Sequence, residues 1–291
     1  VLHLFPFEAN VPAGFRPLLL VSTLGATGTG TMDPLAALAD LAAAERLWLH
    51  ADAAWGGMAA LVPELRPAIA GIERADSITF DAHKSLSVPM AAGMFLTSHP
   101  AILERTFRVG EDYMPRDAEF LRSPGQGPEG PRSGASTSGM AGEARQGPAP
   151  INDPFAHSMQ WSRRFTGLKL FLSLAVAGWQ GYEEVLRHQT EMGHELRRAA
   201  MAEGWHVVND TPLPLVCLAL HPGGDPPEVT AAIVRHAVAS GKVWVSAAAL
   251  PGPRAAVRCC ITNFRTQPQD LAALLETLRE ARQAAAATAP A

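Results

Sequence analysis

Two polar side chains stand just after short apolar segments whose composition is typical of buried strands. Asp52 comes just after the segment 47–50, and Lys84 comes just after the segment 77–80. In open α/β sheets, ligands bind at the carboxyl ends of the strands. Pyridoxal 5'-phosphate (PLP) needs two such groups from a protein, namely a lysine that forms a Schiff base and an acid that faces the pyridine nitrogen. The pair therefore predicts a PLP site, with Asp52 keeping the ring nitrogen protonated.

Each residue alone also has a simpler explanation. An aspartate after a strand is commonly a turn or capping residue, and most lysines are solvated on the surface. The glycine-rich segment 25–30 suggests dinucleotide binding, but its spacing is GxxGxG rather than GxGxxG. A nicotinamide-dependent oxidoreductase would also leave Lys84 without a role. The ordered set of residues favours the PLP site.

The surroundings of Asp52 and Lys84 resemble the group II PLP-dependent amino-acid decarboxylases, which include the aromatic amino-acid and glutamate decarboxylases. The segment 50–57 (HADAAWGG) is similar to the aspartate motif of that family, and the segment 81–84 (DAHK) is similar to its lysine motif. The resemblance implies an α/β protein of the fold-type I PLP-dependent transferase kind, with a partial large domain holding a mixed, mostly parallel sheet and a small C-terminal α/β domain. It also implies an enzyme, a carboxy-lyase that decarboxylates an L-amino acid.

Roles for individual residues follow from the same resemblance. Thr27, in the matching segment 23–27, falls where a threonine contacts the cofactor phosphate. Arg258, in the segment 257–263 (VRCCITN), falls where an arginine faces the substrate carboxylate, although an arginine on a strand is as often a structural ion-pair partner. The expected cofactor-binding residues are Thr27, Asp52, Ala54, Asp81, His83 and Lys84, and the catalytic residues among them are Asp52 and Lys84.

One position departs from the family pattern. The family carries on a flexible loop a tyrosine that protonates the substrate carbon after CO2 leaves. Here no tyrosine lies between Tyr113 and Tyr182, and Phe155 takes the matching position. Because losing that proton donor diverts the reaction towards an aldehyde in relatives, a decarboxylation-dependent aldehyde synthase is an alternative function. His157 is a candidate substrate contact, but a loop histidine without a role is the simpler interpretation.

Hydrophobic patterning predicts the elements that must position these residues. A strand over 15–23, a glycine turn, a helix over 35–46 and a strand over 47–50 form a βαβ unit. Asp33 is predicted to cap that helix, with Pro34 as its first residue. Further strands are expected over 77–80 and 92–97, and a helix over 100–108.

The second half of the chain reads as helices followed by a small α/β region. A helix over 158–177 is predicted to bury Trp161, Phe165, Leu168 and Leu172 on one face, and Gly178 is predicted to end it. A helix over 181–203 follows, then a strand (213–221), a helix (227–240) and two strands (242–247 and 256–262). Thr266 and Gln269 form a predicted capping box for the last helix.

These elements divide into two domains, a partial PLP-binding large domain over 1–178 and a small C-terminal domain over 179–291. The stretch 119–150 is predicted to be flexible. Its residues 123–150 hold seven glycines and five prolines, with Met140 as the only large apolar side chain. Such a stretch cannot bury enough surface to offset its ordering entropy.

Composition excludes several other classes of protein. Hydrophobic residues make up 47% of the 291 residues and charged residues 18%, as in folded soluble proteins. A net charge of -4 gives no sign of nucleic-acid binding, and the longest apolar stretch is too short to span a bilayer. The three cysteines have neither metal-ligand spacing nor a disulfide framework, so we expect no metal and a cytoplasmic location.

The chain starts at Val1 rather than at methionine, and the resemblance covers only the later part of the family's sequence. We therefore expect a fragment without the family's N-terminal dimerisation segment, main phosphate loop and ring-stacking histidine. A catalytically incomplete remnant or association module is the alternative from a different class. A homodimer is expected when the full-length chain is present, with an amino acid as the small-molecule substrate.

Overall fold

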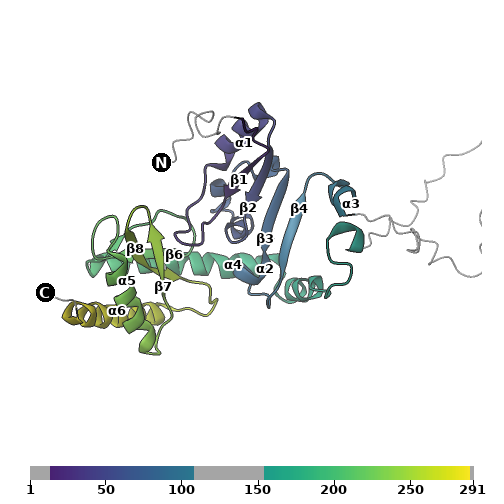
Figure 1. The fold of residues 1–291 in the computed structure, drawn as a ribbon. Coiled ribbons are helices and arrows are strands. Elements are labelled where there is room, and N and C mark those ends of the chain that lie inside the picture. Colours follow the sequence, from purple (N-terminus) through teal and green to yellow (C-terminus); the bar gives the residue numbers. More distant parts are fainter. Residues whose placement is uncertain (1–13, 108–153, 289–291) are drawn as a thin grey trace, which may run out of the picture. The chain divides into compact units, whose positions relative to one another are not determined.

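The structure is a computed structural model that describes residues 14–107 and 154–288 of the chain. It divides into two compact units, one formed by residues 1–98 together with 165–291 and the other by residues 99–164. Figure 1 shows the order of the elements along the chain. In the second unit, α3 (Ile102–Phe107) contacts the short helix η6 (Pro154–His157).

The first sheet carries the chemistry predicted from the sequence. Its strands lie in the order β1 (Leu19–Thr23), β2 (Trp48–Asp52), β3 (Ser77–Asp81) and β4 (Gly93–Thr97). The β1–β2 and β2–β3 pairs are parallel and the β3–β4 pair is antiparallel. Helix α1 (Leu35–Glu45) connects β1 to β2 as the expected βαβ unit. Because the first three strands are parallel, their carboxyl ends meet at one edge.

The two faces of this sheet differ in burial. Along β2, Leu49 and Ala51 are buried in the core, while His50 and Asp52 on the opposite face remain partly accessible. Thr23 pairs with Asp52 in register, so the end of β1 lies on the same face. Asp52 therefore projects from the more open face of the sheet, at the edge where the parallel strands end.

The second sheet is antiparallel and lies in the C-terminal part of the chain. Its strands lie in the order β5 (His206–Val207), β6 (Leu215–Ala219), β8 (Arg254–Cys260) and β7 (Ser246–Leu250). Helices α5 (Pro227–Ala239) and α6 (Pro268–Thr288) cover one face, and the core there contains Val216, Leu218 and Val257. The other face, including Leu215 and Cys217, joins the core of the first sheet.

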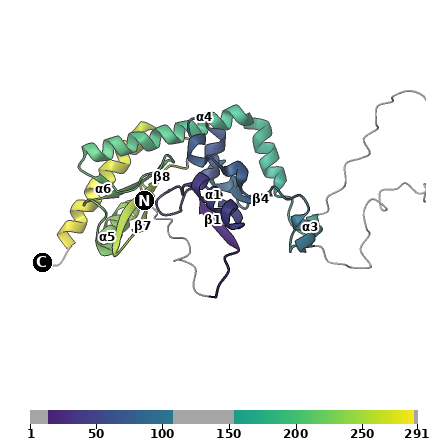
Figure 2. The ribbon, with the colours of Figure 1, turned by 90° about the horizontal axis from the view of Figure 1, so that it is seen from above.

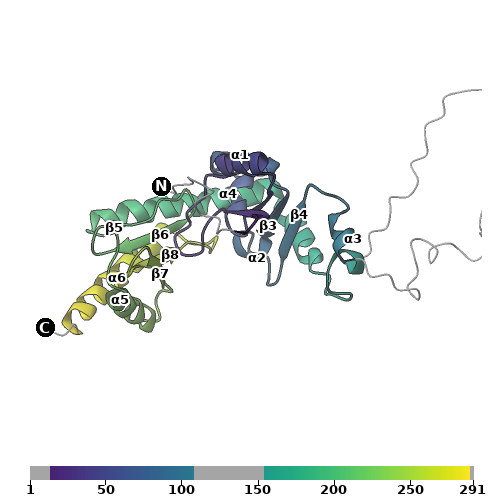
Figure 3. The same ribbon diagram turned by 45° about the horizontal axis from the view of Figure 1, so that its top comes forward.

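The longest helix, α4 (Gly167–Ala202), contacts parts of the chain on both sides of this shared core. It contacts η2 (Gly56–Leu61) and also β5, β6 and α6; Figure 3 shows it alongside both sheets. At Gly178 the backbone leaves the helical region (φ 67°, ψ 174°), and Figure 2 shows the resulting bend. The predicted break at Gly178 is therefore confirmed. The remaining short helices are α2 (Ala82–Ser85), η3 (Arg66–Ile69) and η4 (Ile72–Arg74).

Several local predictions are wrong. The strand expected over 242–247 lies at Ser246–Leu250, and Pro34 precedes α1 instead of beginning it. Asp33 does not cap α1, because its carboxylate accepts a hydrogen bond from the amide of Thr23 instead (2.7 Å). Helix α6 begins at Pro268, and the predicted capping box of Thr266 and Gln269 does not form. Instead, the carboxylate of Asp270 accepts a hydrogen bond from the Gln267 amide (2.9 Å). Helix α4 begins at Gly167 rather than near 158. Consequently Trp161 and Phe165 precede the helix. The predicted apolar face is not buried, because Trp161, Phe165, Leu168 and Leu172 are all exposed.

The expected fold class is confirmed, since the first sheet is mixed and mostly parallel and the C-terminal part combines a sheet with helices. The boundary at 178/179 stays a prediction, and the stretch 119–150 lies outside the described residues. Among the helices in the described ranges, none has the length and apolar character that a membrane span requires.

Candidate active site

Lys84 lies directly beyond the end of β3, on the one-turn helix α2. Its Nζ is 3.0 Å from Oδ2 of Asp81, the last residue of β3. The side chain of Asp81 is 16% exposed and that of Lys84 is 40% exposed. The ammonium group is thus paired with a carboxylate yet remains accessible to a small molecule approaching the sheet edge.

His83 is neutral in this arrangement. Its Nδ1 accepts a hydrogen bond from the amide of Ala92 (3.1 Å), so this nitrogen carries no proton and the ring proton lies on Nε2. Nε2 faces Asp81 at 3.9 Å, which is too long for a hydrogen bond. His83 therefore presents a fixed, uncharged imidazole beside the Asp81–Lys84 pair.

The aspartate motif and the lysine motif are joined through backbone groups. The amide of Ala54 donates to Oδ1 of Asp52 (3.2 Å), and the carbonyl of the same residue accepts from the amide of Asp81 (3.0 Å). The hydroxyl of Ser85 donates to the carbonyl of Trp55 (3.1 Å) and is buried. Ala54 thus contributes through its main chain, and the two motifs form one hydrogen-bonded unit.

The glycine turn begins beside Asp52, because the Leu24 amide donates to the Asp52 carbonyl (2.8 Å). Gly25 has φ +92°, and an added Cβ would lie 3.0 to 3.2 Å from Leu213, Gly56 and Trp55. Both the backbone conformation and the lack of space require glycine at this position. The end of β2 and the turn are therefore held together.

Four consecutive carbonyls of this turn accept hydrogen bonds from side chains of the C-terminal part. The donors to residues 27, 28, 29 and 30 are, in that order, Arg258 Nε (2.8 Å), Cys217 Sγ (3.5 Å), Asn209 Nδ2 (2.8 Å) and Thr211 Oγ1 (2.6 Å). Since a trans peptide holds its N–H opposite its C=O, the amides of Gly28 and Thr29 point away from the second sheet. The exposed Thr27 belongs to the same turn.

The fold thus places Arg258 beside Thr27, where its side chain supports the glycine turn through a hydrogen bond. The contact to the Thr27 carbonyl uses Nε (2.8 Å), and the Arg258 side chain is also hydrogen-bonded to Cys260. Its predicted contact with a substrate carboxylate stays a prediction.

The cysteines near Arg258 are unreactive thiols. All three cysteines are free thiols. Burial raises the pKa of Cys217 to about 11 and that of Cys259 to about 12, and it also raises the pKa of Cys260. The charge of Arg258 opposes but does not cancel this effect. Neutral thiols are poor nucleophiles and poor metal ligands, so these residues serve packing.

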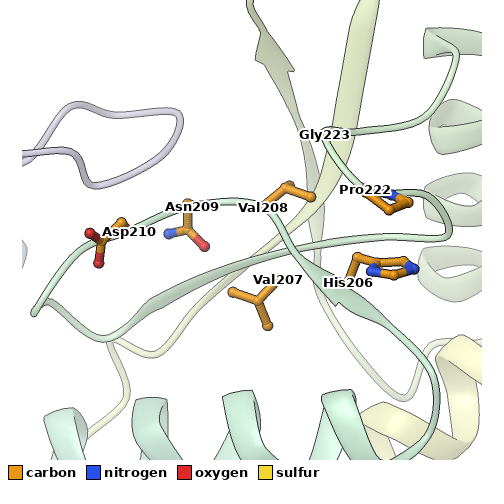
Figure 4. A pocket seen from close by; sticks show the side chains of 7 residues that line it. All are labelled: His206, Val207, Val208, Asn209, Asp210, Pro222 and Gly223. Atoms are coloured by element: carbon orange, nitrogen blue, oxygen red, sulfur yellow. The ribbon is translucent and has the colours of Figure 1, made fainter. Parts of the chain in front are cut away.

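A separate cavity of about 450 Å³ lies in the C-terminal part (Figure 4). It is lined by residues 206–210 together with Pro222 and Gly223. None of the site residues predicted from the sequence lines it. Within the described residues, no group of three or more histidine, cysteine, aspartate or glutamate side chains is arranged to hold a metal ion.

Sequence reasoning missed the residues that act through hydrogen bonds to the backbone. Asn209 and Thr211 hold the glycine turn, and Lys169 donates to carbonyls of the segment that follows Lys84. No local pattern marks these contacts, because the partners are about 80 to 180 residues apart. Phe155 and the loop before it lie where no side chain is described.

Comparisons with known proteins found similar sequences and structures. Residues 7–122 match the pyridoxal-dependent decarboxylase conserved domain. The aromatic-L-amino-acid decarboxylase of Bacillus atrophaeus is 27% identical over 272 residues, which cover 91% of this chain and 51% of that protein. The phenylacetaldehyde synthase of a Rosa hybrid cultivar is 26% identical over 293 residues, covering 97% of this chain and 52% of that protein.

A solved structure shows the same fold. The crystal structure of Oryza sativa TDC with PLP and tryptamine superposes with a TM-score of 0.77 at 23% identity, covering 95% of this chain and 53% of that one. The chain is therefore similar in sequence and in fold to pyridoxal-dependent decarboxylases. It spans about half the length of the curated relatives named above.

The polar groups at the sheet edge fit PLP, the cofactor of the pyridoxal-dependent decarboxylases that this chain resembles. An accessible amine at Lys84 suits the aldehyde, and a carboxylate at Asp52 suits the pyridine nitrogen. The hydroxyl of Thr27 and the amides of Gly28 and Thr29 suit a phosphate dianion. The residues present thus offer partners for the aldehyde, the pyridine nitrogen and the phosphate of the cofactor.

Proposed function

We propose that this chain carries the lysine and aspartate half of a PLP-dependent amino-acid decarboxylase site. The observation that supports this proposal most is the Lys84–Asp81 pair, joined through Ala54 to Asp52 at one edge of the sheet. When bound, PLP supplies the electron sink that accepts the electron pair left behind as CO2 departs.

Each residue of the proposed site has its own role. Lys84 would hold the cofactor through its Nζ. Asp52 stabilises a proton on the pyridine nitrogen through its carboxylate, which the Ala54 amide orients. Asp81 holds Lys84 near the reacting carbon, and the neutral His83 forms a wall of the site. Arg258 binds the substrate carboxylate while its Nε supports the glycine turn.

A titration with PLP followed by product analysis tests this proposal. We expect the wild-type chain, or the full-length protein that contains it, to gain the yellow absorbance of lysine-bound PLP and to release CO2 from an L-amino acid. Lys84→Ala should lose both properties. Retention of the absorbance by Lys84→Ala would remove Lys84 from its role. CO2 release by this chain alone would rule out a non-catalytic remnant.

An aldehyde synthase is the second candidate. Two observations support this candidate. The resemblance matches Phe155 to the family's loop tyrosine, and the Rosa relative is a phenylacetaldehyde synthase. Such an enzyme consumes O2 and water with the amino acid, and it releases CO2, aldehyde, ammonia and hydrogen peroxide. A decarboxylase releases CO2 and amine without consuming O2. Oxygen uptake with aldehyde formation would therefore favour the synthase.

We also propose that the full-length protein forms a homodimer. The large apolar side chains that α4 exposes, Phe171, Val176 and Trp179, support this proposal because homodimer interfaces are richer in apolar side chains than the rest of a protein surface. Sedimentation of the full-length protein as a monomer at micromolar concentration would contradict it.

A further inference from the structure

The segment 86–92 connects the lysine helix α2 to strand β4. It buries Leu86, Val88 and Ala92, whereas residues 89–91 between them are exposed. Both ends are tied to the start of α2, because the Leu86 amide donates to the Ala82 carbonyl (3.2 Å) and the Ala82 amide donates to the Ala92 carbonyl (2.9 Å). The position of α2 therefore depends on how this segment is held.

Lys169, on the first half of α4, binds the exposed part of this segment. Its Nζ donates to the carbonyls of Met90 (2.6 Å) and Pro89 (3.0 Å), with that of Ala91 at 3.5 Å. An ammonium group has three N–H donors, and hydrogen bonds from a charged donor are the stronger kind. Lys169 is half-buried beside Leu170, which packs on the core of the first sheet. The helix thus directs this ammonium group towards residues 89–91.

The contact between Lys169 and residues 89–91 is connected to Lys84 through Ala92 and α2. Residues 89–91 adjoin Ala92, whose amide donates to Nδ1 of His83 and whose carbonyl accepts from Ala82. Ala82 and His83 directly precede Lys84 on α2. We infer that Lys169 is a positioning residue, which holds the segment 86–92 and through it the orientation of His83 and Lys84. The importance of this orientation for the cofactor rests on the proposed function.

Amide hydrogen exchange of the chain without cofactor tests the structural part of this inference. In Lys169→Met, which keeps the apolar stem, the amides of Ala82 and Ala92 should exchange about tenfold faster, while those of β6 and β8 keep wild-type rates. Lys169→Arg should restore slow exchange, since a guanidinium can also donate to several carbonyls. Lys242→Met is the matched control, because Lys242 lies on the surface near Glu280. Wild-type rates at both amides in Lys169→Met, or a uniform rise across the chain, would overturn the inference.

Lysine labelling tests the consequence for the site. At sub-saturating PLP, borohydride fixation at Lys84 should fall several-fold in Lys169→Met and recover in Lys169→Arg, without a matching change in melting temperature. Wild-type labelling in Lys169→Met would refute the positioning role. If the wild-type chain itself shows no label at Lys84, the proposed function fails, and the exchange measurement still decides whether Lys169 holds the segment.

Discussion

At the scale of single residues, the chemistry depends on the charge of a few side chains at one sheet edge. Asp52 is the clearest case, since Asn in its place keeps the shape and the contact with the Ala54 amide but removes the charge. We expect Asp52→Asn in an active full-length protein to retain PLP at Lys84 and to release CO2 on the order of a hundredfold more slowly, because each 1.36 kcal/mol of lost transition-state stabilisation costs tenfold. Parallel assays of absorbance and CO2 measure this difference. Near-normal turnover would show that another group contacts the ring nitrogen.

The buried cysteines predict a loss of stability at high pH. The pKa of Cys217 rises from an ordinary 9.0 to about 11 on burial, so the folded chain keeps a proton that the unfolded chain releases. This thiol therefore costs no stability below pH 9, and the free energy of unfolding falls as pH rises from 9 to about 11, by about 1.4 kcal/mol per pH unit.

Urea unfolding of the wild-type chain and of Cys217→Ser at pH 8 and pH 10.5 measures this effect. The variant lacks the titrating thiol, so its stability should fall less between the two pH values. Equal falls in both proteins would contradict the assignment.

At the scale of elements, the ends of the strands in the first sheet must be closely packed. An added Cβ at Gly56 would lie 2.2 Å from the carbonyl oxygen of Leu24, at the end of β1. Gly56→Ala should therefore lower the free energy of unfolding by at least about 2 kcal/mol, as overpacking against backbone does.

Thermal or urea unfolding checks this prediction. Gly181→Ala is the matched control, because its Cβ would make ordinary contact with Ala177 at 3.5 Å inside a helix. That variant should lose no stability. A Gly56→Ala chain as stable as the wild type would show that the turn relaxes without cost.

Elements with strong periodic or propensity signals could be predicted from the sequence, whereas their edges and contacts could not. The strands that end at Asp52 and Asp81 were expected because short apolar runs lie over 47–50 and 77–80. The start of α4 was misplaced, since Trp161 and Phe165 match a helical spacing but precede the helix. The face of α4 that packs inwards carries Lys169 and Leu170, which an apolar stripe does not reveal.

In the candidate site, too, the residues with a local sequence signal could be predicted and the tertiary contacts could not. Asp52, His83 and Lys84 could be chosen from their motifs, because the order of residue types carries the signal. Neither the backbone role of Ala54 nor the support of the turn by Thr211 has such a signal. Both depend on groups that are brought together only by the tertiary fold.

At the scale of the whole molecule, the C-terminal sheet and the glycine turn form one structure. Thr211 Oγ1 donates to the Gly30 carbonyl at 2.6 Å, and the residue is buried. Thr211→Val keeps the shape and leaves that carbonyl unpaired, at a cost of about 1–3 kcal/mol. We expect this variant to bind PLP several-fold more weakly, because the turn that faces the phosphate loses a support.

Thr277→Val provides the control for this prediction. Its hydroxyl is also buried and donates to a backbone carbonyl, that of Ala273 within α6. Both variants should lose stability, but only Thr211→Val should weaken PLP binding in a spectral titration. Equal PLP affinity in the two variants would show that the turn does not depend on the C-terminal sheet.

The covalent attachment of PLP to Lys84 is the central claim, and the sequence makes its test unusually direct. The chain contains only three lysines, Lys84, Lys169 and Lys242. The purified chain is mixed with PLP, reduced with borohydride, digested and mapped by mass spectrometry. We predict a label predominantly on Lys84, with Lys169 spared because its ammonium group is bound to carbonyls and Lys242 marking the background of a surface lysine. A label on Lys84 no greater than that on Lys242 would contradict the account.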